Sequence, residues 1–151
     1  MNSELDPKDS ELLRALQEDF PLTERPFAEI AERMGWTEEE VISGIKILTD
    51  SGVIRKLGAV LNPRKMGYVS VLAAVDVPDE RLDETAAVIN GYDSVTHNYQ
   101  REGDPNLWFT MTEPDSETLE KHLVEIEKST GLPVIRMPVT KMFKIGVKLD
   151  I

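Results

Sequence analysis

Two short segments carry the side chains of this sequence that are best suited to chemistry. The run His-Asn-Tyr-Gln-Arg begins at His97, and after a turn the run Asn-Leu-Trp-Phe-Thr begins at Asn106. If the first run belongs to a strand that starts at Val95, alternation places Val95, His97, Tyr99 and Arg101 on one face. An imidazole, a phenol and a guanidinium then share one surface. Because polar groups cost about 1 to 3 kcal/mol when buried without a partner, this face is a candidate binding or catalytic surface.

Composition limits the chemistry that this face can support. The 151 residues include no cysteine, which excludes disulfides, thiolate nucleophiles and cysteine-ligated metal clusters. His97 and His122 are the only histidines and therefore the only imidazole ligands. The sequence contains no apolar run of the roughly 20 residues needed to span a membrane, and its first residues lack a signal-peptide pattern, so a cytoplasmic protein is expected.

The negative charge is concentrated in the first third of the chain. Residues 1–52 contain 13 Asp and Glu against 5 Lys and Arg, whereas residues 53–151 contain 15 against 12. Proteins bind duplex DNA largely by neutralising phosphates with Lys and Arg. A region with a net charge of −8 is therefore poorly matched to DNA.

Three short helices are predicted in this acidic region. Asp6-Pro7 and an apolar stripe predict a helix that continues to Phe20, and Pro26 opens a second that ends at Gly35. Thr37 begins a capping box for a third helix, which runs to about Ser51. Helices of this length with tight turns predict a helix-turn-helix (winged-helix-like) unit over residues 1–52.

The remaining residues predict a second domain of α+β class. Residues 53–66 form a predicted β linker, with a strand over Val53–Asn62, and the domain itself spans residues 67–151. The order βαββαβ is that of a ferredoxin-like fold, with two helices on an antiparallel sheet. The alternating tail Thr140–Ile151 predicts an additional strand. Within the domain, the predicted strands are 68–77, 95–101, 107–112 and 134–139, and the predicted helices are 78–90 and 116–130.

In layout, nearly the whole chain resembles the Lrp/AsnC family of amino-acid-responsive regulators. Three segments resemble more specifically the siroheme decarboxylases and their relatives in heme d1 biosynthesis: Gly52–Val60, Thr96–Arg101 and Asn106–Thr110. One position departs from that pattern, because Pro105 stands where an aromatic residue commonly precedes the last segment. A contact with the wall of the expected pocket depends on that aromatic residue.

This resemblance implies a non-oxidative reaction. Siroheme would lose the carboxylates of its C12 and C18 acetates to give 12,18-didecarboxysiroheme in an alternative heme pathway. The resemblance also implies related subunits, A and B, and favours a heterodimer while leaving a homodimer open. No cofactor is implied beyond the iron tetrapyrrole substrate.

Under this resemblance, the first segment takes specific roles. His97 is expected to donate a proton or to ligate the iron axially, with His122 as a second-choice ligand. Tyr99 is expected to relay a proton or orient a carboxylate, and Arg101 to hold the acetate that leaves. The residues expected to bind the rest of the substrate are Asn98, Trp108, Arg64, Arg136, Lys141 and Lys144.

Two other functions remain open at this level. A ligand-responsive regulator would bind an operator through the third helix, but that helix begins Thr37-Glu38-Glu39-Glu40 and contains Lys46 as its only cation. Carboxylates at the N-terminus of a helix interact favourably with the helix dipole but repel phosphate, so DNA binding is not expected. The chain could also be a non-catalytic subunit that completes the pocket of another chain.

Overall fold

The computed structural model describes residues 5–144, 146 and 149, and the chain divides into two compact units. Of the described residues, one unit comprises 5–59, 146 and 149, and the other comprises 60–144. Each unit has its own hydrophobic core, so each is described by itself. Among the described residues, no helix combines the length and the apolar character that crossing a membrane requires.

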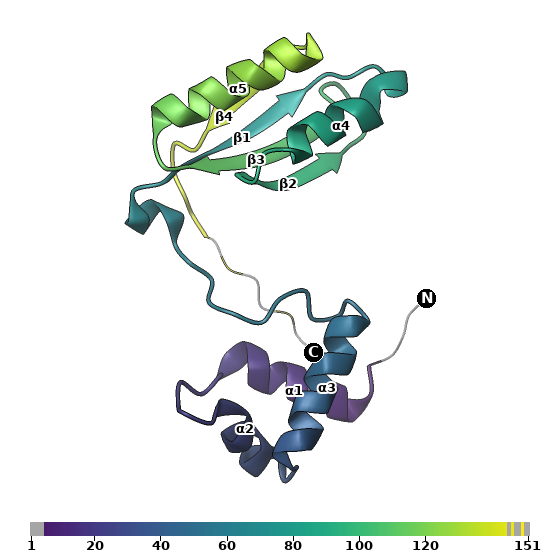
Figure 1. Cartoon of the computed structure of the whole chain (residues 1–151), viewed down its shortest axis with the longest axis vertical. Helices are drawn as coiled ribbons and strands as arrows, with labels where there is room; N and C mark the ends of the chain where they lie inside the picture. Colours follow the sequence, from purple (N-terminus) through teal and green to yellow (C-terminus); the bar gives the residue numbers. More distant parts are fainter. Residues whose placement is uncertain (1–4, 145, 147–148, 150–151) are drawn as a thin grey trace. The chain divides into compact units, whose positions relative to one another are not determined.

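The helical unit contains the three predicted helices: α1 (Pro7–Glu18), α2 (Pro26–Met34) and α3 (Glu38–Asp50) (Figure 1). The Thr37 hydroxyl accepts a hydrogen bond from the Glu40 amide, and the Glu40 carboxylate accepts one from the Thr37 amide, which confirms the capping box. Gly35 ends α2 with φ = 67°, a left-handed conformation that favours glycine. Leu12, Ile30 and Val41 are fully buried between the helices.

The predicted strand over Val53–Asn62 is wrong. These residues contain no regular secondary structure, and a short 3₁₀ helix, η1 (Pro63–Met66), follows them. Val60 is 98% exposed. A strand needs a neighbour to satisfy its backbone groups, and no other described segment pairs with this one. Alternation in the sequence therefore does not produce a strand here.

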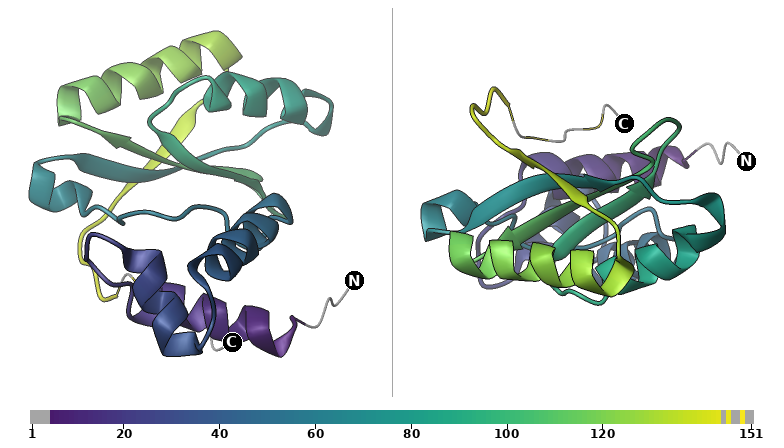
Figure 2. Two further views of the ribbon diagram at one scale, coloured as in Figure 1. Left: turned by 60° about the horizontal axis from the view of Figure 1, so that its bottom comes forward. Right: turned by 90° about the horizontal axis from the view of Figure 1, so that it is seen from above.

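The second unit is an α+β sandwich of the predicted ferredoxin-like type. Its four antiparallel strands are arranged in the order β2-β3-β1-β4. Helices α4 and α5 both lie on one face of this sheet (Figures 1 and 2). The elements are β1 (Val69–Val75), η2 (Asp79–Arg81), α4 (Leu82–Asn90), β2 (Val95–Gln100), β3 (Leu107–Glu113), α5 (Ser116–Thr130) and β4 (Val134–Pro138).

The core of this unit lies between the sheet and the two helices. Phe109 and Met111 of β3 are at most 1% exposed and belong to the same buried cluster as Ile89 of α4 and Ile126 of α5. At full burial, side chains of this size each contribute about 1.5 to 3 kcal/mol. This packing leaves the other face of the sheet without an α-helix in the described part of the unit.

The tail does not form the predicted additional strand in its described part. Residues 140–144, 146 and 149 have no strand conformation, and the remaining positions of that prediction lie outside the described residues. The Gln17 carboxamide holds Leu149 by donating to its carbonyl (2.8 Å) and accepting from its amide (2.9 Å). At Leu149 the backbone of the tail is therefore hydrogen-bonded to a side chain and not to a neighbouring strand.

Arg136 of β4 links the sheet to α5 through two carboxylates. Its guanidinium lies 2.9 Å from a Glu127 oxygen and 2.8 Å from a Glu120 oxygen. Glu127 also accepts a hydrogen bond from the Val134 amide (2.9 Å). The hydrogen bonds from Arg136, followed by the one from Val134, lower the pKa of Glu127, and the same pairing raises the pKa of Arg136.

We expect Glu127 to make the stability of this unit depend on pH. Because its pKa is lower in the folded state, the ionised carboxylate favours folding above the unfolded-state pKa of about 4.3, and this contribution is lost as pH falls through the folded-state value. Urea unfolding between about pH 6 and pH 3 should therefore show a smaller decrease in stability for Glu127→Gln than for the unaltered chain. Glu102→Gln, at an exposed turn position, is the control and should retain the full decrease.

Candidate functional site

The pairing of the strands determines which side chains lie on the open face of the sheet, the face opposite α4 and α5. Along β3, Leu107, Phe109 and Met111 are buried against the helices, so Trp108 and Thr110 between them point to the open face. Their partners on β1 are Ala74 and Leu72, respectively. On β2, His97 lies opposite Thr110 and Tyr99 lies opposite Trp108, which puts both on the open face.

Four of the predicted site residues meet on this face. The ring centres of His97 and Tyr99 are 5.9 Å apart. The Arg101 guanidinium carbon lies 5.9 Å from the centre of the Trp108 ring, within range of a cation–π interaction. The Trp108 ring is also held by a hydrogen bond, because its indole N–H donates to the Pro105 carbonyl (2.8 Å). An imidazole, a phenol, an indole and a guanidinium therefore share one surface.

Val95 does not belong to this surface, and that part of the prediction is wrong. It pairs with Met111 on the helix-covered face, whereas His97 pairs with Thr110. A β-bulge lies between Val95 and His97, so two residues of β2 face one residue of β3. This extra residue shifts the alternation, which simple counting from Val95 could not reveal.

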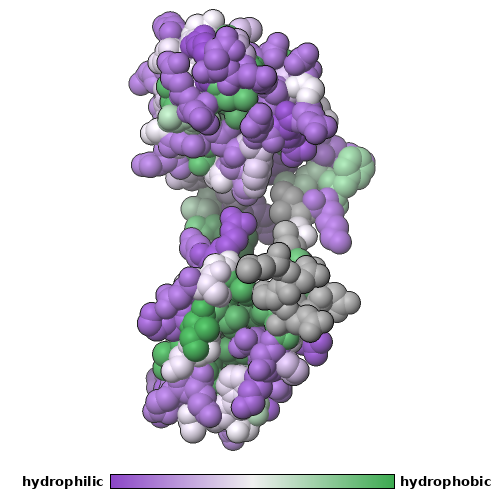
Figure 3. Space-filling view, turned by 90° about the vertical axis from the view of Figure 1, so that its right-hand side faces the viewer, coloured by the Kyte–Doolittle hydropathy of each residue, from purple (hydrophilic) through white to green (hydrophobic). Residues whose placement is uncertain are grey.

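Apolar side chains surround the polar groups on the open face. Leu72 of β1 is 37% exposed, Ile135 of β4 is 47% exposed and Tyr99 of β2 is 52% exposed. Leu72 and Ile135 alternate with buried residues of their strands, and Tyr99 lies opposite Trp108, so all three belong to the uncovered face. The side of the molecule drawn in Figure 3 is largely hydrophilic, with smaller hydrophobic areas. The open face can thus accept a flat, partly apolar molecule.

Asn106, which sequence reasoning did not name as a site residue, links the β2–β3 turn to the segment that follows β1. Its carboxamide accepts from the Val77 amide (2.9 Å) and donates to the Val77 carbonyl (2.8 Å). Its own carbonyl accepts from the Arg101 amide (2.8 Å). Asn106 therefore fixes the backbone from which Arg101 reaches Trp108.

We expect Asn106→Ala to lower the free energy of unfolding by about 1 to 3 kcal/mol, the cost of leaving a buried polar group unpaired. Val77 is only 2% exposed, so water does not readily replace the lost partner. Urea unfolding measures this difference. Glu102→Ala, an exposed position in the same turn, is the matched control. An equal loss in both variants would show that any change in this turn is destabilising and that the two bonds to Val77 make no special contribution.

Asn98, His122 and Arg136 lie on the helix-covered side of the sheet. Asn98 donates to the Asn90 side chain (3.0 Å), and Arg136 makes the ion pairs to α5 described above. The His122 Nδ1 lies 2.6 Å from an oxygen of Glu113, which is 5% exposed. The sheet therefore separates these three from His97, and within one chain His97 and His122 cannot face one ligand together.

The other predicted cations are exposed and lie outside the polar and aromatic group of the open face. Arg64 lies in η1, and Lys141 and Lys144 lie in the segment after β4. The Lys141 ammonium is 4.8 Å from the centre of the Phe143 ring. Of the predicted cations, the structure brings only Arg101 to the aromatic groups of the open face.

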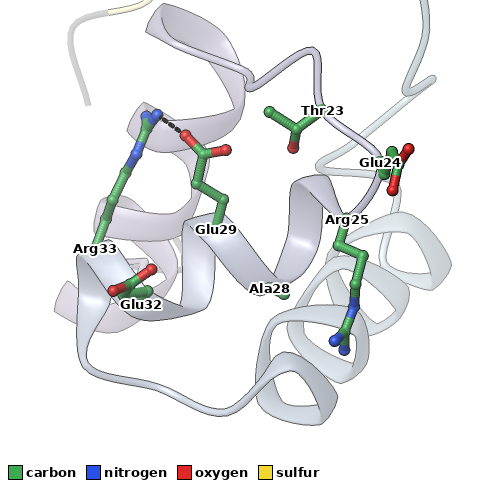
Figure 4. A pocket seen from close by; sticks show the side chains of 7 residues that line it. All are labelled: Thr23, Glu24, Arg25, Ala28, Glu29, Glu32 and Arg33. Atoms are coloured by element: carbon green, nitrogen blue, oxygen red, sulfur yellow. Dashed lines mark hydrogen bonds and ion pairs between the residues drawn. The ribbon is translucent and has the colours of Figure 1, made fainter.

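A surface hollow in the helical unit is less suited to this chemistry. Figure 4 shows the residues that line it, with Glu29 and Arg33 joined in an ion pair. Arg33 also contacts Asp19 (2.7 Å), so its charge is already balanced. The hollow lacks the imidazole and aromatic groups of the open face. Its lining residues are Thr23, Glu24, Arg25, Ala28, Glu29, Glu32 and Arg33.

Comparison with known domains agrees with this fold. Residues 65–144 match the AsnC-like ligand binding domain, and residues 9–55 match the siroheme decarboxylase NirDL-like helix-turn-helix domain. The fold and these two domains define the chain as an AsnC-like protein, with a helix-turn-helix unit and a ligand-binding unit.

Two individual relatives identify a particular family within this class of AsnC-like proteins. The chain is 41% identical to the siroheme decarboxylase alpha subunit of Desulfovibrio desulfuricans over 96% of this chain and 84% of that protein. It is 45% identical to the siroheme decarboxylase NirDL subunit of Paracoccus denitrificans over 95% of this chain, but it spans only 44% of that longer protein. The chain belongs to the siroheme decarboxylase family.

A solved structure of the same family also matches. The crystal structure of the siroheme decarboxylase NirDL in complex with an iron-uroporphyrin III analogue aligns with a TM-score of 0.67 and 28% identity. This alignment covers 93% of the present chain and 47% of the NirDL chain.

Proposed function

We propose that this chain is a subunit of a cytoplasmic siroheme decarboxylase, which removes the carboxylates of the C12 and C18 acetates to give 12,18-didecarboxysiroheme. The observation that carries the proposal is the cluster of His97, Tyr99, Trp108 and Arg101 on the open face. Family membership supports it, as does the complex of a relative with an iron-uroporphyrin III analogue. In this proposal the iron tetrapyrrole is substrate, and no further cofactor is required.

The open face suits the shape and charge of siroheme. A flat macrocycle gains contact by lying on the apolar side chains around Tyr99 and Trp108. The Arg101 guanidinium can bind a carboxylate through two parallel hydrogen bonds. Because holding the departing carboxylate tightly would stabilise the ground state, binding energy should come mainly from the carboxylates that do not react.

The reaction needs an acid close to the reacting acetate. When the bond between the methylene and the carboxylate breaks, carbon dioxide leaves and the electron pair remains on the methylene carbon, delocalised into the macrocycle. A proton then joins that carbon to form a methyl group. His97 can donate this proton and recover it from solvent, and Tyr99 beside it can orient the carboxylate.

We propose that a second, related subunit covers the open face. One chain supplies a single wall, with Leu72 and Ile135 exposed beside the polar cluster, and a tetrapyrrole needs contacts on both of its faces. A heterodimer is the favoured arrangement, and a homodimer is the alternative. Light scattering of the chain alone and of the chain mixed with its relative distinguishes the two.

The charges of α3 support an enzyme over a DNA-binding regulator. Lys46 is paired with Asp50 at 2.7 Å, and Arg25 is paired with Glu38 at the beginning of α3. Cations that are already neutralised offer little to phosphates. We therefore propose that the helical unit serves subunit packing.

The experiment that tests the function is direct conversion of substrate. Siroheme is incubated with the purified chain under reducing, anaerobic conditions, with and without the related subunit, and the products are separated and weighed by mass spectrometry. A product lighter by two carbon dioxides is the expected result. Unchanged siroheme with both subunits present would overturn the proposal. Sequence-specific, salt-dependent binding to DNA would favour the regulator instead.

A further inference from the structure

The β-bulge in β2 places two successive side chains, Thr96 and His97, on the same face of the sheet. Neighbouring residues of a regular strand point to opposite faces, so their side chains do not meet. Here the Thr96 hydroxyl oxygen and the His97 Nδ1 are 3.0 Å apart. The bulge is what allows this contact.

Thr110, directly across from His97 on β3, completes a triangle of polar atoms. Its hydroxyl oxygen lies 2.7 Å from that of Thr96 and 3.3 Å from the His97 Nδ1. All three distances are within hydrogen-bonding range. Nδ1 is thus engaged by two hydroxyls on the sheet, and Nε2, on the opposite side of the ring, has no bonding partner among the described residues.

The placement of the hydroxyl protons favours hydrogen bonds that run from the threonines to the His97 Nδ1, and not the reverse. At 2.7 Å one hydroxyl must donate to the other, and the accepting hydroxyl still has its own proton to place. Nδ1 is within reach of both hydroxyls, so a chain of donation that ends on Nδ1 uses both protons. If Nδ1 carried the proton and donated it, the last hydroxyl would have to donate to solvent, because these contacts are exposed and offer it no third acceptor within the triangle. A neutral His97 should therefore carry its proton on Nε2.

We propose that Thr96 and Thr110 are positioning residues that hold His97 through Nδ1 and present Nε2–H to the substrate. His97 then faces the substrate with Nε2–H, which cannot ligate iron, because an axial ligand needs a free electron pair on Nε2. To act as the acid, the ring first takes up a second proton from solvent. It then gives the Nε2 proton to the substrate and is left neutral with its proton on Nδ1, which the rotating threonine hydroxyls can accept. This inference rests on the proposed function and deepens it. It distinguishes between the two roles that the sequence left open for His97.

The position of the proton can be measured by nitrogen NMR without substrate. In the ¹⁵N-labelled full chain under alkaline conditions, where imidazoles are neutral, long-range ¹H–¹⁵N spectra show which nitrogen of each ring is protonated. With only two histidines in the chain, His122→Gln assigns the signals. We expect His97 to carry its proton on Nε2 and to show a hydrogen-bonded Nδ1.

Variants of Thr96 and Thr110 test whether their hydroxyls determine the hydrogen bonding of the His97 Nδ1. Thr110→Val removes one hydroxyl with little change in shape and should move the His97 Nδ1 signal toward that of a free imidazole, as should Thr96→Val. Thr110→Ser restores a hydroxyl and should restore the signal. The matched control is Thr112→Val, which breaks a similar hydroxyl pair with Ser70 (2.9 Å) on the same face and should leave His97 unchanged. Amide spectra confirm that each variant is folded.

Two results would overturn the inference: a His97 protonated mainly on Nδ1, or a His97 whose signals do not change in either valine variant. In the decarboxylation assay, Thr110→Val should reduce kcat by about tenfold with a smaller change in KM, as expected for a misoriented acid. Inactivity of the unaltered chain would count against the proposed function alone, since the NMR result does not depend on turnover.

Discussion

Replacing His97 with alanine should lower the rate of siroheme decarboxylation by about 10²- to 10⁴-fold, the usual contribution of a positioned general acid. His97 is exposed on the open face and contributes no side chain to the hydrophobic core, so the variant should fold like the unaltered chain. The loss should appear mainly in kcat, because the apolar face and Arg101 still bind the macrocycle.

The assay compares both versions of the chain in the presence of the related subunit, with circular dichroism to verify folding. Ser70→Ala, on the same face but outside the cluster, is the control and should retain full activity. Undiminished turnover by His97→Ala would show that this chain only completes the pocket of its partner. The same substitution should also be followed in the absorption spectrum of bound siroheme, where loss of ligation-sensitive bands would contradict a purely acidic role.

Phe109→Ala should lower the free energy of unfolding by about 3 to 5 kcal/mol, the range for truncating a large buried aromatic residue. Phe109 is 1% exposed and lies in the cluster that joins the sheet to α4 and α5. Trp108→Ala, one position earlier, should cost only about 1 to 2 kcal/mol, since the indole lies partly exposed on the open face. Phe109 is therefore expected to contribute mainly to core packing, and Trp108 mainly to substrate binding.

Urea unfolding gives the stability difference, and siroheme binding followed by absorption gives the functional one. Trp108→Ala should weaken binding of the macrocycle, whereas Phe109→Ala should affect binding only through the population of folded protein. Equal stability losses in the two variants would contradict the assignment of Trp108 and Phe109 to opposite faces of β3.

Much of the fold follows from local patterns in the sequence. Thr37 and Glu40 cap α3 through contacts within one turn, and Gly35 ends α2 because its backbone needs a left-handed conformation. The alternating burial of the side chains along β3 follows from the alternation of residue types around Phe109. Such signals act over a few residues, so they can be recognised without knowledge of the tertiary structure. The same signals separated Trp108 from Phe109 and identified His97, Tyr99 and Arg101 as one group.

By itself, then, the sequence determined the order of the elements and the residue types available for chemistry, and its resemblance to a family pointed to siroheme. Only the tertiary structure decided which of those residues meet. Arg136 turns to the carboxylates of α5, and Val53–Asn62 forms no strand because it lacks a neighbour. The bulge before His97 depends on pairing with β3 and brings Thr110 beside the imidazole. Strand register and ion pairing depend on partners distant in the chain, which local periodicity does not specify.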